Sequence, residues 1–191
     1  MTGLHKTQIS KTKKMKQLSF AVLVGATLLL SAFTTIKSVD WKISDDYSIK
    51  FKGKDAEGIF KTMSGDISFD ENDLNNSRFS TSINVTSINT GNGMKNKIAK
   101  SDNWFDADKY PSINFISSKF SKSTNGYLVE GTIEMHGTKK QIVIPFTFSS
   151  NVFKGNFSVN RTDFGVGTME GMSKKVSNEI ALEISVPVTK K

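Results

Sequence analysis

Apolar and polar residues alternate along most of the chain from Val39 onward, in runs of about ten residues. In the run 78–85, Phe, Thr, Ile and Val stand at the odd positions and Arg, Ser, Ser and Asn at the even ones. The same alternation runs through 127–135, 142–148, 153–159 and 180–188. A period of two is typical of strands with one face in a core and the other in water. The pattern therefore predicts an all-β protein.

Eight strands account for these runs, with turn-forming residues between them. Most links between them are short, so the sheet should be antiparallel, and several strands exceed the usual five or six residues. Eight long strands with one apolar face each can bury those faces by closing, which predicts an elongated eight-stranded antiparallel β-barrel. The strands are expected at 41–52, 58–69, 78–88, 112–121, 126–136, 140–149, 152–161 and 179–188.

Two places depart from the regular strand pattern. The stretch 91–100 has no alternation, and Met94 and Ile98 lie at helical spacing, which predicts one short inserted helix near 93–101. Pro145 lies within the strand 140–149. Because proline has no backbone N–H to donate to a ladder, we expect an edge-like or bulged point there.

The first 35 residues are typical of a secretory signal. A basic segment that ends at Lys16 precedes an apolar stretch, whose strongest part, 20–30, is short for a membrane span. The alternative is an uncleaved N-terminal anchor, and Met15 offers a second start. We expect residues 1–35 to be a signal peptide and 36–191 the mature domain, periplasmic or secreted, with no stable membrane span after cleavage.

Composition narrows the function classes further. The net charge is +8, but five of the lysines lie in residues 1–35, and 36–191 carries 21 basic and 18 acidic residues. These are scattered, whereas a nucleic-acid footprint needs a basic stripe, so we expect no nucleic-acid partner. The chain has no cysteine, which excludes disulfides, thiolate metal sites and a lipidated N-terminal cysteine.

Few residues suggest catalysis or metal binding. Of the two histidines, His136 is the one in the mature chain, beside Gly137 at a hairpin, where a local hydrogen bond is the simpler role. The chain has no phosphate loop, nucleophile elbow or metal-spaced histidine set. We therefore expect no catalytic residue, no metal and no cofactor apart from a bound lipid.

Two short segments are candidates for the barrel mouth. Arg161 and Asp163 end a strand before a glycine-rich loop, so the arginine could meet a polar head group, or the two could pair and fix the loop. Trp104 and Phe105 lie in a loop between two aspartates. Such aromatic residues can plug one end of a barrel or line a ligand entrance.

The chain resembles the YceI-like family of exported lipid-binding proteins, a lipocalin-like group, from about Trp41 to Val188. The motifs that carry the resemblance are 65–70 (GDISFD), 85–90 (VTSINT), 101–106 (SDNWFD), 110–115 (YPSINF), 137–139 (GTK) and 160–167 (NRTDFGVG). Family members often carry an Arg/Lys-Asp-x-His-Leu pattern before Ser101. Here 95–100 reads KNKIAK, so any role of that acid and histidine does not transfer.

The resemblance implies a barrel that encloses a long-chain isoprenoid lipid, of the isoprenoid quinone or polyprenyl type. The alternatives are a ligand-free structural or stress-related envelope barrel, and an enzyme that acts on such a lipid. A homodimer is a further expectation. If apolar residues face inward, the lining candidates are Phe79, Ile83, Phe115, Val129, Ile133, Ile144, Phe146, Phe157, Val159, Leu182 and Ile184.

Overall fold

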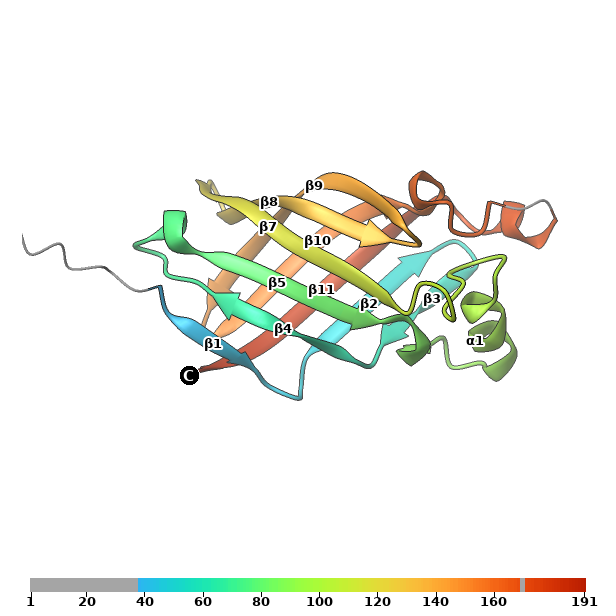
Figure 1. The fold of residues 1–191 in the computed structure, drawn as a ribbon, viewed down its shortest axis with the longest axis horizontal. Helices are drawn as coiled ribbons and strands as arrows, with labels where there is room; N and C mark the ends of the chain where they lie inside the picture. Colours follow the sequence, from blue (N-terminus) through green and yellow to red (C-terminus); the bar gives the residue numbers. More distant parts are fainter. Residues whose placement is uncertain (1–37, 169–170) are drawn as a thin grey trace, which may run out of the picture. The chain divides into compact units, whose positions relative to one another are not determined.

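The computed structural model describes residues 38–168 and 171–191, which form one sheet of eleven strand segments (Figure 1). The strands are β1 (Asp40–Ile43), β2 (Ser48–Gly53), β3 (Ala56–Phe60), β4 (Met63–Ser68), β5 (Arg78–Asn84), β6 (Ile88–Asn89), β7 (Ser112–Ser123), β8 (Gly126–Met135), β9 (Thr138–Ser149), β10 (Val152–Asn160) and β11 (Glu179–Lys190). The helices are α1 (Gly93–Lys100) and the short 3₁₀ turns η1 (Leu74–Asn76), η2 (Val85–Ser87), η3 (Arg161–Phe164) and η4 (Met172–Lys175).

The sheet closes into an eight-stranded antiparallel barrel, as predicted. β1 and β2 follow one another along β11, so together they make one barrel strand. β3 and β4 form the next, and β5 and β6 the third. β7 to β11 complete the wall, and β11 returns to pair with β1 and β2. The inserted helix α1 lies within one residue of its predicted bounds.

The three N-terminal strands are broken, which corrects the prediction that 41–52, 58–69 and 78–88 are continuous. In the second, the inward residues Phe60 and Met63 are three apart, an odd separation that one uninterrupted strand cannot place on one face. Val85 and Ile88 repeat this shift in the third. The breaks therefore turn apolar side chains of opposite parity toward the same interior.

Side-chain hydroxyls satisfy the backbone at these breaks. The Tyr47 hydroxyl donates to the carbonyl of Lys61 and accepts from the N–H of Met63, at 3.0 and 2.8 Å. The Ser87 hydroxyl accepts from the N–H groups of Lys61 and Thr62, at 3.1 and 3.0 Å. Because unpaired backbone groups are costly when shielded from water, these bonds allow the wall to bend without orphaned donors.

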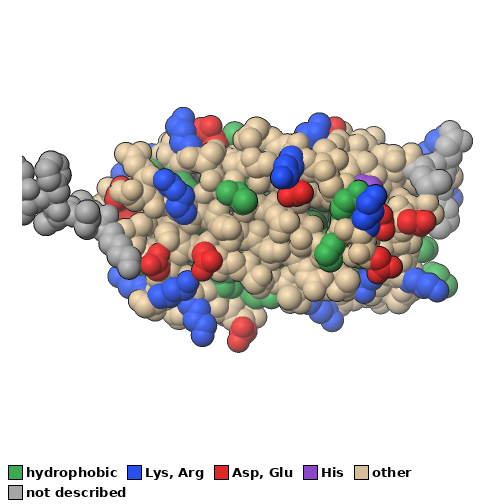
Figure 2. All heavy atoms as spheres, viewed as in Figure 1, with side chains coloured by type: hydrophobic (Ala, Val, Ile, Leu, Met, Phe, Trp, Pro, Cys, Tyr) green, Lys and Arg blue, Asp and Glu red, His purple; other side chains and the backbone are tan. Residues whose placement is uncertain are grey.

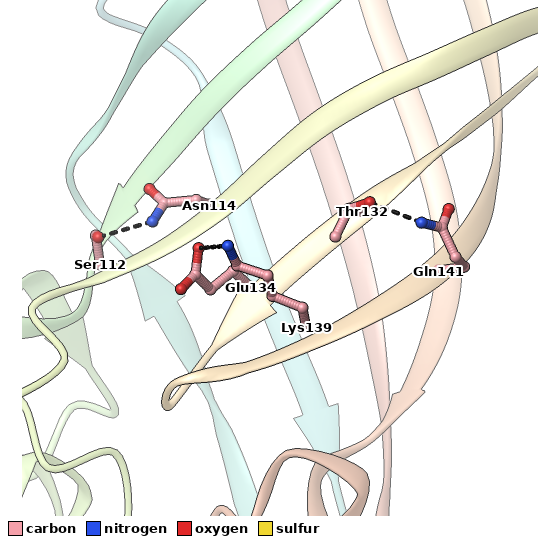
Figure 3. A network of polar contacts seen from close by, with 6 residues as sticks. All are labelled: Ser112, Asn114, Thr132, Glu134, Lys139 and Gln141. Carbon is pink, nitrogen blue, oxygen red and sulfur yellow. Dashed lines mark hydrogen bonds and ion pairs between the residues drawn. The ribbon is translucent and has the colours of Figure 1, made fainter.

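The outer face of the barrel wall is polar, because the polar residues that alternate with the apolar ones point outward. Across β8 and β9, Gln141 donates to the Thr132 hydroxyl at 2.8 Å, and Lys139 lies 3.6 Å from Glu134 (Figure 3). Exposed pairs of this kind contribute at most about 1 kcal/mol each. Burial of the apolar inner face, not these pairs, holds the barrel together.

Pro145 marks the point where the ladder between β9 and β10 ends. Those strands pair only from Val152 opposite Ser149 to Gly155 opposite Phe146, and Pro145 is the next residue along β9. β9 continues paired to β8 alone, and β10 to β11. The predicted edge-like point at this proline is confirmed, and its physical reason is the missing N–H donor.

One end of the barrel is filled by aromatic side chains around Phe69, which is 1% exposed. Its ring centroid lies 5.2–6.2 Å from six other rings. These rings belong to Phe79, Phe120, Tyr127, Phe146, Phe148 and Phe153. The indole N–H of Trp41 donates to the Phe69 carbonyl at 2.9 Å, which ties β1 to this cluster. We call this group the Phe69 cluster.

Candidate functional site: the barrel cavity

A cavity of about 740 Å³ occupies the barrel between the Phe69 cluster and the opposite end. Apolar side chains of both the broken and the unbroken strands form most of its wall. At the far end from the Phe69 cluster, the β2–β3 turn, α1 with the loop behind it, and the η3–η4 segment surround the opening. In Figure 1, α1 and the η3–η4 segment lie at the same end of the barrel, opposite the C-terminus.

All eleven residues that the alternation turned inward lie on the cavity wall. They come from six of the eight barrel strands, so the cavity is bordered by side chains far apart in the chain. In the middle of this wall, Thr81 of β5 faces the cavity between Phe79 and Ile83. Contact of these residues with a ligand remains a prediction.

The floor of the cavity is made of rings that cross the barrel. Phe79 on β5, Phe146 on β9 and Phe153 on β10 all line the cavity, and their centroids lie 5.3–6.0 Å apart. β5 and β10 are on opposite sides of the barrel in the strand order. Phe69 packs behind these rings and does not reach the cavity. The rings therefore close the barrel at this level.

Trp104 and Phe105 lie at the mouth and line the cavity, half-buried. The Phe105 ring meets Phe60 edge-on at 6.0 Å, so it packs against the wall. The Trp104 ring packs against the guanidinium of Arg161, at 5.3 Å, and lies close to Gly167. A Cβ atom on Gly167 would come within 2.7 Å of that ring. The two aromatic residues thus form the upper wall of the cavity.

Arg161 is 6% exposed and lies at the centre of the segment that runs from η3 to η4 at the mouth, which we call the mouth loop. Its guanidinium donates to five backbone carbonyls and one side chain at 2.5–3.1 Å. The acceptors are the carbonyls of Val166, Gly167, Ser173, Val176 and Ser177 and the Oδ1 atom of Asn178. Burial lowers the pKa of this guanidinium, which nevertheless stays protonated at neutral pH.

These contacts correct both alternatives for the Arg161–Asp163 pair. The arginine fixes the loop, but through carbonyls, whereas Asp163 points to Lys140 at 3.9 Å and does not line the cavity. Each guanidinium N–H already has an acceptor within the protein, so Arg161 has no donor left for a head group. Its role at the mouth is to hold the loop against Trp104.

His136 has the local role expected of it. Its Nδ1 atom lies 3.1 Å from the Phe164 carbonyl, and its ring packs edge-on against Tyr110 at 4.8 Å. This joins the β8–β9 hairpin to η3 and thereby supports the mouth loop.

The rim of the mouth is polar and carries both signs of charge. Asp55 and Glu57 line it from β2–β3, Lys95 from α1 and Lys175 from η4. On the face drawn in Figure 2, basic and acidic side chains are likewise interspersed rather than gathered into a stripe. Asn92 caps the N-terminus of α1, because its side chain accepts from the N–H of Lys95 at 3.0 Å. The opening is thus lined by charged side chains, whereas the interior wall is apolar.

Several wall residues were missing from the predicted lining. They include Ile49, Phe51, Phe60, Met63, Ile67, Ile88, Ile98, Ile113, Met135, Phe153, Ile180 and Val186. Those on β2, β3 and β4 share the strands whose breaks were missed. Phe153, Ile180 and Val186 have the same parity as residues predicted to face inward, so extending each run to its ends would have found them.

The comparison with known families settles what kind of barrel this is. A family model described as the YceI-like domain matches residues 41–188, which is most of the chain. The chain belongs to the YceI-like family. Its segment 95–100, which lacks the acid and histidine of the family pattern, forms most of α1.

YceI-like relatives and solved structures agree with this assignment. A UPF0312 protein of Vibrio parahaemolyticus is 31% identical over 158 residues, which cover 76% of this chain and 80% of the relative. The solved BcnA of Burkholderia cenocepacia is 26% identical, with a TM-score of 0.73 over 78% of this chain and 99% of that one. A polyisoprenoid binding domain from Saccharophagus degradans shares the fold, with a TM-score of 0.58 over 80% and 99% at 13% identity.

The described residues offer neither a metal site nor a membrane-spanning helix. Within 38–168 and 171–191, no group of histidine and acidic side chains is arranged to hold a metal ion. In the same part of the chain, no helix has the length and hydropathy needed to cross a membrane. The signal peptide predicted for residues 1–35 lies outside the described residues.

Proposed function

We propose that this YceI-like barrel binds a long-chain isoprenoid lipid, of the quinone or polyprenyl type, in its interior. The observation that carries the proposal is the cavity of about 740 Å³, which has an apolar wall, a closed floor and a polar rim. Ligand pockets of this size commonly enclose most of a drug-sized molecule. The solved Saccharophagus degradans barrel of the same fold is described as polyisoprenoid binding, which supports the choice of lipid class.

The ligand-free structural barrel is the weaker alternative for a physical reason. A closed core fills its interior at close to crystal density, and voids larger than a water molecule are few. An apolar cavity of this size loses the contacts that a filled core would gain. A bound chain would restore those contacts, which is why a carrier or storage role explains the cavity better.

Lipid extraction with mass spectrometry tests the proposal on protein purified from its native envelope. We expect an isoprenoid lipid in the wild-type protein, and a marked loss of it in Leu182→Gln, which places an amide in the apolar wall. Glu183→Gln is the matched control. Glu183 is the next residue along the strand, and its side chain faces outward and pairs with Lys50 at 2.9 Å. Absence of lipid from the wild-type protein would favour the ligand-free barrel, and turnover of an added isoprenoid would make it an enzyme.

Export is part of the same proposal. Replacing Leu28, Leu29 and Leu30 with charged residues should leave the protein in the cytoplasm, because the apolar stretch of the signal would be interrupted. Cell fractionation measures this, and normal secretion of the variant would contradict the signal peptide. The expected homodimer is tested by light scattering on the mature chain.

A further inference from the structure

Two elements project at the open end of the barrel, and both carry basic residues. In Figure 1, α1 and the orange-red segment that contains η4 reach further along the long axis than the β2–β3 turn. The helix α1 carries Lys95, Lys97 and Lys100 and no acid, and η4 ends in Lys174 and Lys175. Lys100 is half-buried and the other four are exposed. We call these five residues the mouth lysines.

The lysines of α1 are not neutralised by ion pairs within the described residues. The salt bridges found there join residues of the wall, of η3 and of the closed end, and none includes Lys95, Lys97 or Lys100. The acids that line the opening, Asp55 and Glu57, belong to the β2–β3 side. Elsewhere the two signs are interspersed, as Figure 2 shows for one face. The charge of α1 is therefore available to a partner outside the barrel.

An exposed apolar side chain lies beside these charges. Met94 is 68% exposed, more than any other large hydrophobic residue that the structure describes. It lies in α1 four residues before Ile98, which lines the cavity, and residues four apart share one face of a helix. Apolar side chains next to lysines are typical of helices that lie at a membrane interface. The pattern at α1 thus combines both features of such a helix.

We propose that the open end of the barrel docks on an anionic bilayer surface, with the mouth lysines at the lipid head groups and Met94 in the interface. Charge complementarity favours this partner, because each lysine close to an anionic bilayer raises affinity roughly fivefold. A bilayer also accepts an apolar side chain beside the charges, which the phosphates of a nucleic acid do not. The cavity then opens toward the membrane.

This docking goes beyond the proposed function, because a barrel can bind an isoprenoid lipid in solution without contact with a membrane. Co-sedimentation with vesicles measures it on the mature domain, residues 36–191. The chain from Thr35 to Lys191 forms one compact unit, and its use removes the lysines and the apolar stretch of residues 1–35.

Binding should depend on the charge of the bilayer. We expect the domain to bind vesicles of phosphatidylcholine with phosphatidylglycerol at least about tenfold more tightly than vesicles of phosphatidylcholine alone. Raising the salt concentration from about 0.1 M to about 1 M should remove most of this difference, because the Debye length falls from about 10 Å to about 3 Å. Glu57→Gln, which removes an acid at the opening, should strengthen binding a few-fold.

The triple variant Lys95→Gln, Lys97→Gln and Lys100→Gln removes the charge of α1. It should weaken binding to the anionic vesicles by roughly tenfold to 100-fold. The matched control makes the same change in net charge at three exposed lysines near the Phe69 cluster, and should keep wild-type affinity. These control substitutions are Lys42→Gln in β1, Lys122→Gln at the end of β7 and Lys191→Gln after β11. Urea unfolding checks that both triple variants fold as the wild type does.

Met94 allows the orientation to be tested separately. Because the chain has no cysteine, Met94→Cys carries a single environment-sensitive fluorophore, and Lys122→Cys carries the same fluorophore at the closed end. Anionic vesicles should shift the emission to the blue at position 94 and leave it unchanged at position 122. Met94→Gln should bind the vesicles about fivefold more weakly, since an amide replaces the apolar group in the interface.

The possible failures are distinguishable. Equal losses in the two triple variants, or a blue shift at position 122 instead of 94, would overturn docking through the mouth. Absence of vesicle binding would do the same, whereas isoprenoid binding stands or falls by lipid extraction. If the α1 lysines bind a short oligonucleotide and not vesicles, the partner is a nucleic acid. If light scattering shows that the α1 variant has lost a dimer and vesicles are not bound, this end is an interface between copies of the chain.

Discussion

Replacement of Arg161 by methionine tests how much the hydrogen bonds of its guanidinium stabilise the loop at the mouth. The side chain keeps its bulk over Trp104 but loses six hydrogen bonds, five of them to carbonyls of the segment 166–177. Hydrogen bonds of a charged donor contribute about 1.5–3 kcal/mol each before the cost of burying the guanidinium, which is several kcal/mol. Methionine avoids that burial cost, so we expect a net loss of at least about 3 kcal/mol.

Urea and thermal unfolding measure this loss, which corresponds to about 6–12 °C in Tm for a domain of this size. Hydrogen exchange should locate it, with protection lost at the N–H groups of Val166 and Val176. Asp163→Asn is the control, because its exposed pairing with Lys140 at 3.9 Å contributes little. A loss below about 1 kcal/mol in Arg161→Met, or an equal loss in Asp163→Asn, would refute the conclusion that Arg161 stabilises the loop through its bonds to backbone carbonyls.

Three further predictions concern the cavity and the closed end of the barrel. Phe146→Ala in the floor should cost about 3–5 kcal/mol by urea unfolding, whereas Phe157→Ala, which is half-buried on the cavity wall, should cost clearly less; equal costs would argue for a filled core. Thr81→Val should raise the affinity for a prenyl diphosphate several-fold in a titration followed by tryptophan fluorescence, because no hydroxyl is then desolvated, and a lower affinity would contradict the inward placement of Thr81. The hydrogen bond to Glu71 at 2.6 Å raises the pKa of Tyr127 to about 12, so this bond stabilises the fold below pH 10 and is lost between pH 10 and 12. Absorbance titration should show one late-ionising tyrosine, absent in Tyr127→Phe.

The alternation of residue types was sufficient to predict the wall of the barrel. The closed eight-stranded architecture, the helix at 93–100 and the inward faces of six barrel strands all follow from a period of two and its one interruption. Pro145 could be interpreted as well, since a missing N–H is a local property of one residue. These features depend only on which positions are apolar.

The breaks in the first three strands could have been detected but were not. A change in parity between Phe60 and Met63, and between Val85 and Ile88, is visible in the sequence. Its interpretation requires knowing that both members of each pair face the interior, which is a tertiary fact. Arg161 shows a harder case, because backbone carbonyls satisfy its charge. Every residue carries a backbone carbonyl, so the sequence does not mark which carbonyls accept from Arg161. The nearby Asp163 was therefore the partner that the sequence suggested.

The pattern of apolar positions does not predict where the cavity ends and the filled core begins. The interior of an eight-stranded barrel is just wide enough for side chains to fill, so the size of the inward side chain decides whether a level is open or closed. At the Phe153 level the inward residues are mostly aromatic, and their rings meet across the barrel. One inward step toward the mouth, Gly155 contributes no side chain and Ile184 opposite it on β11 is aliphatic, and there the cavity is open. The inward positions follow the same alternation at both levels, although the cavity is open at one level and closed at the other. Exchanging side-chain size between such levels should therefore move the floor without changing the fold.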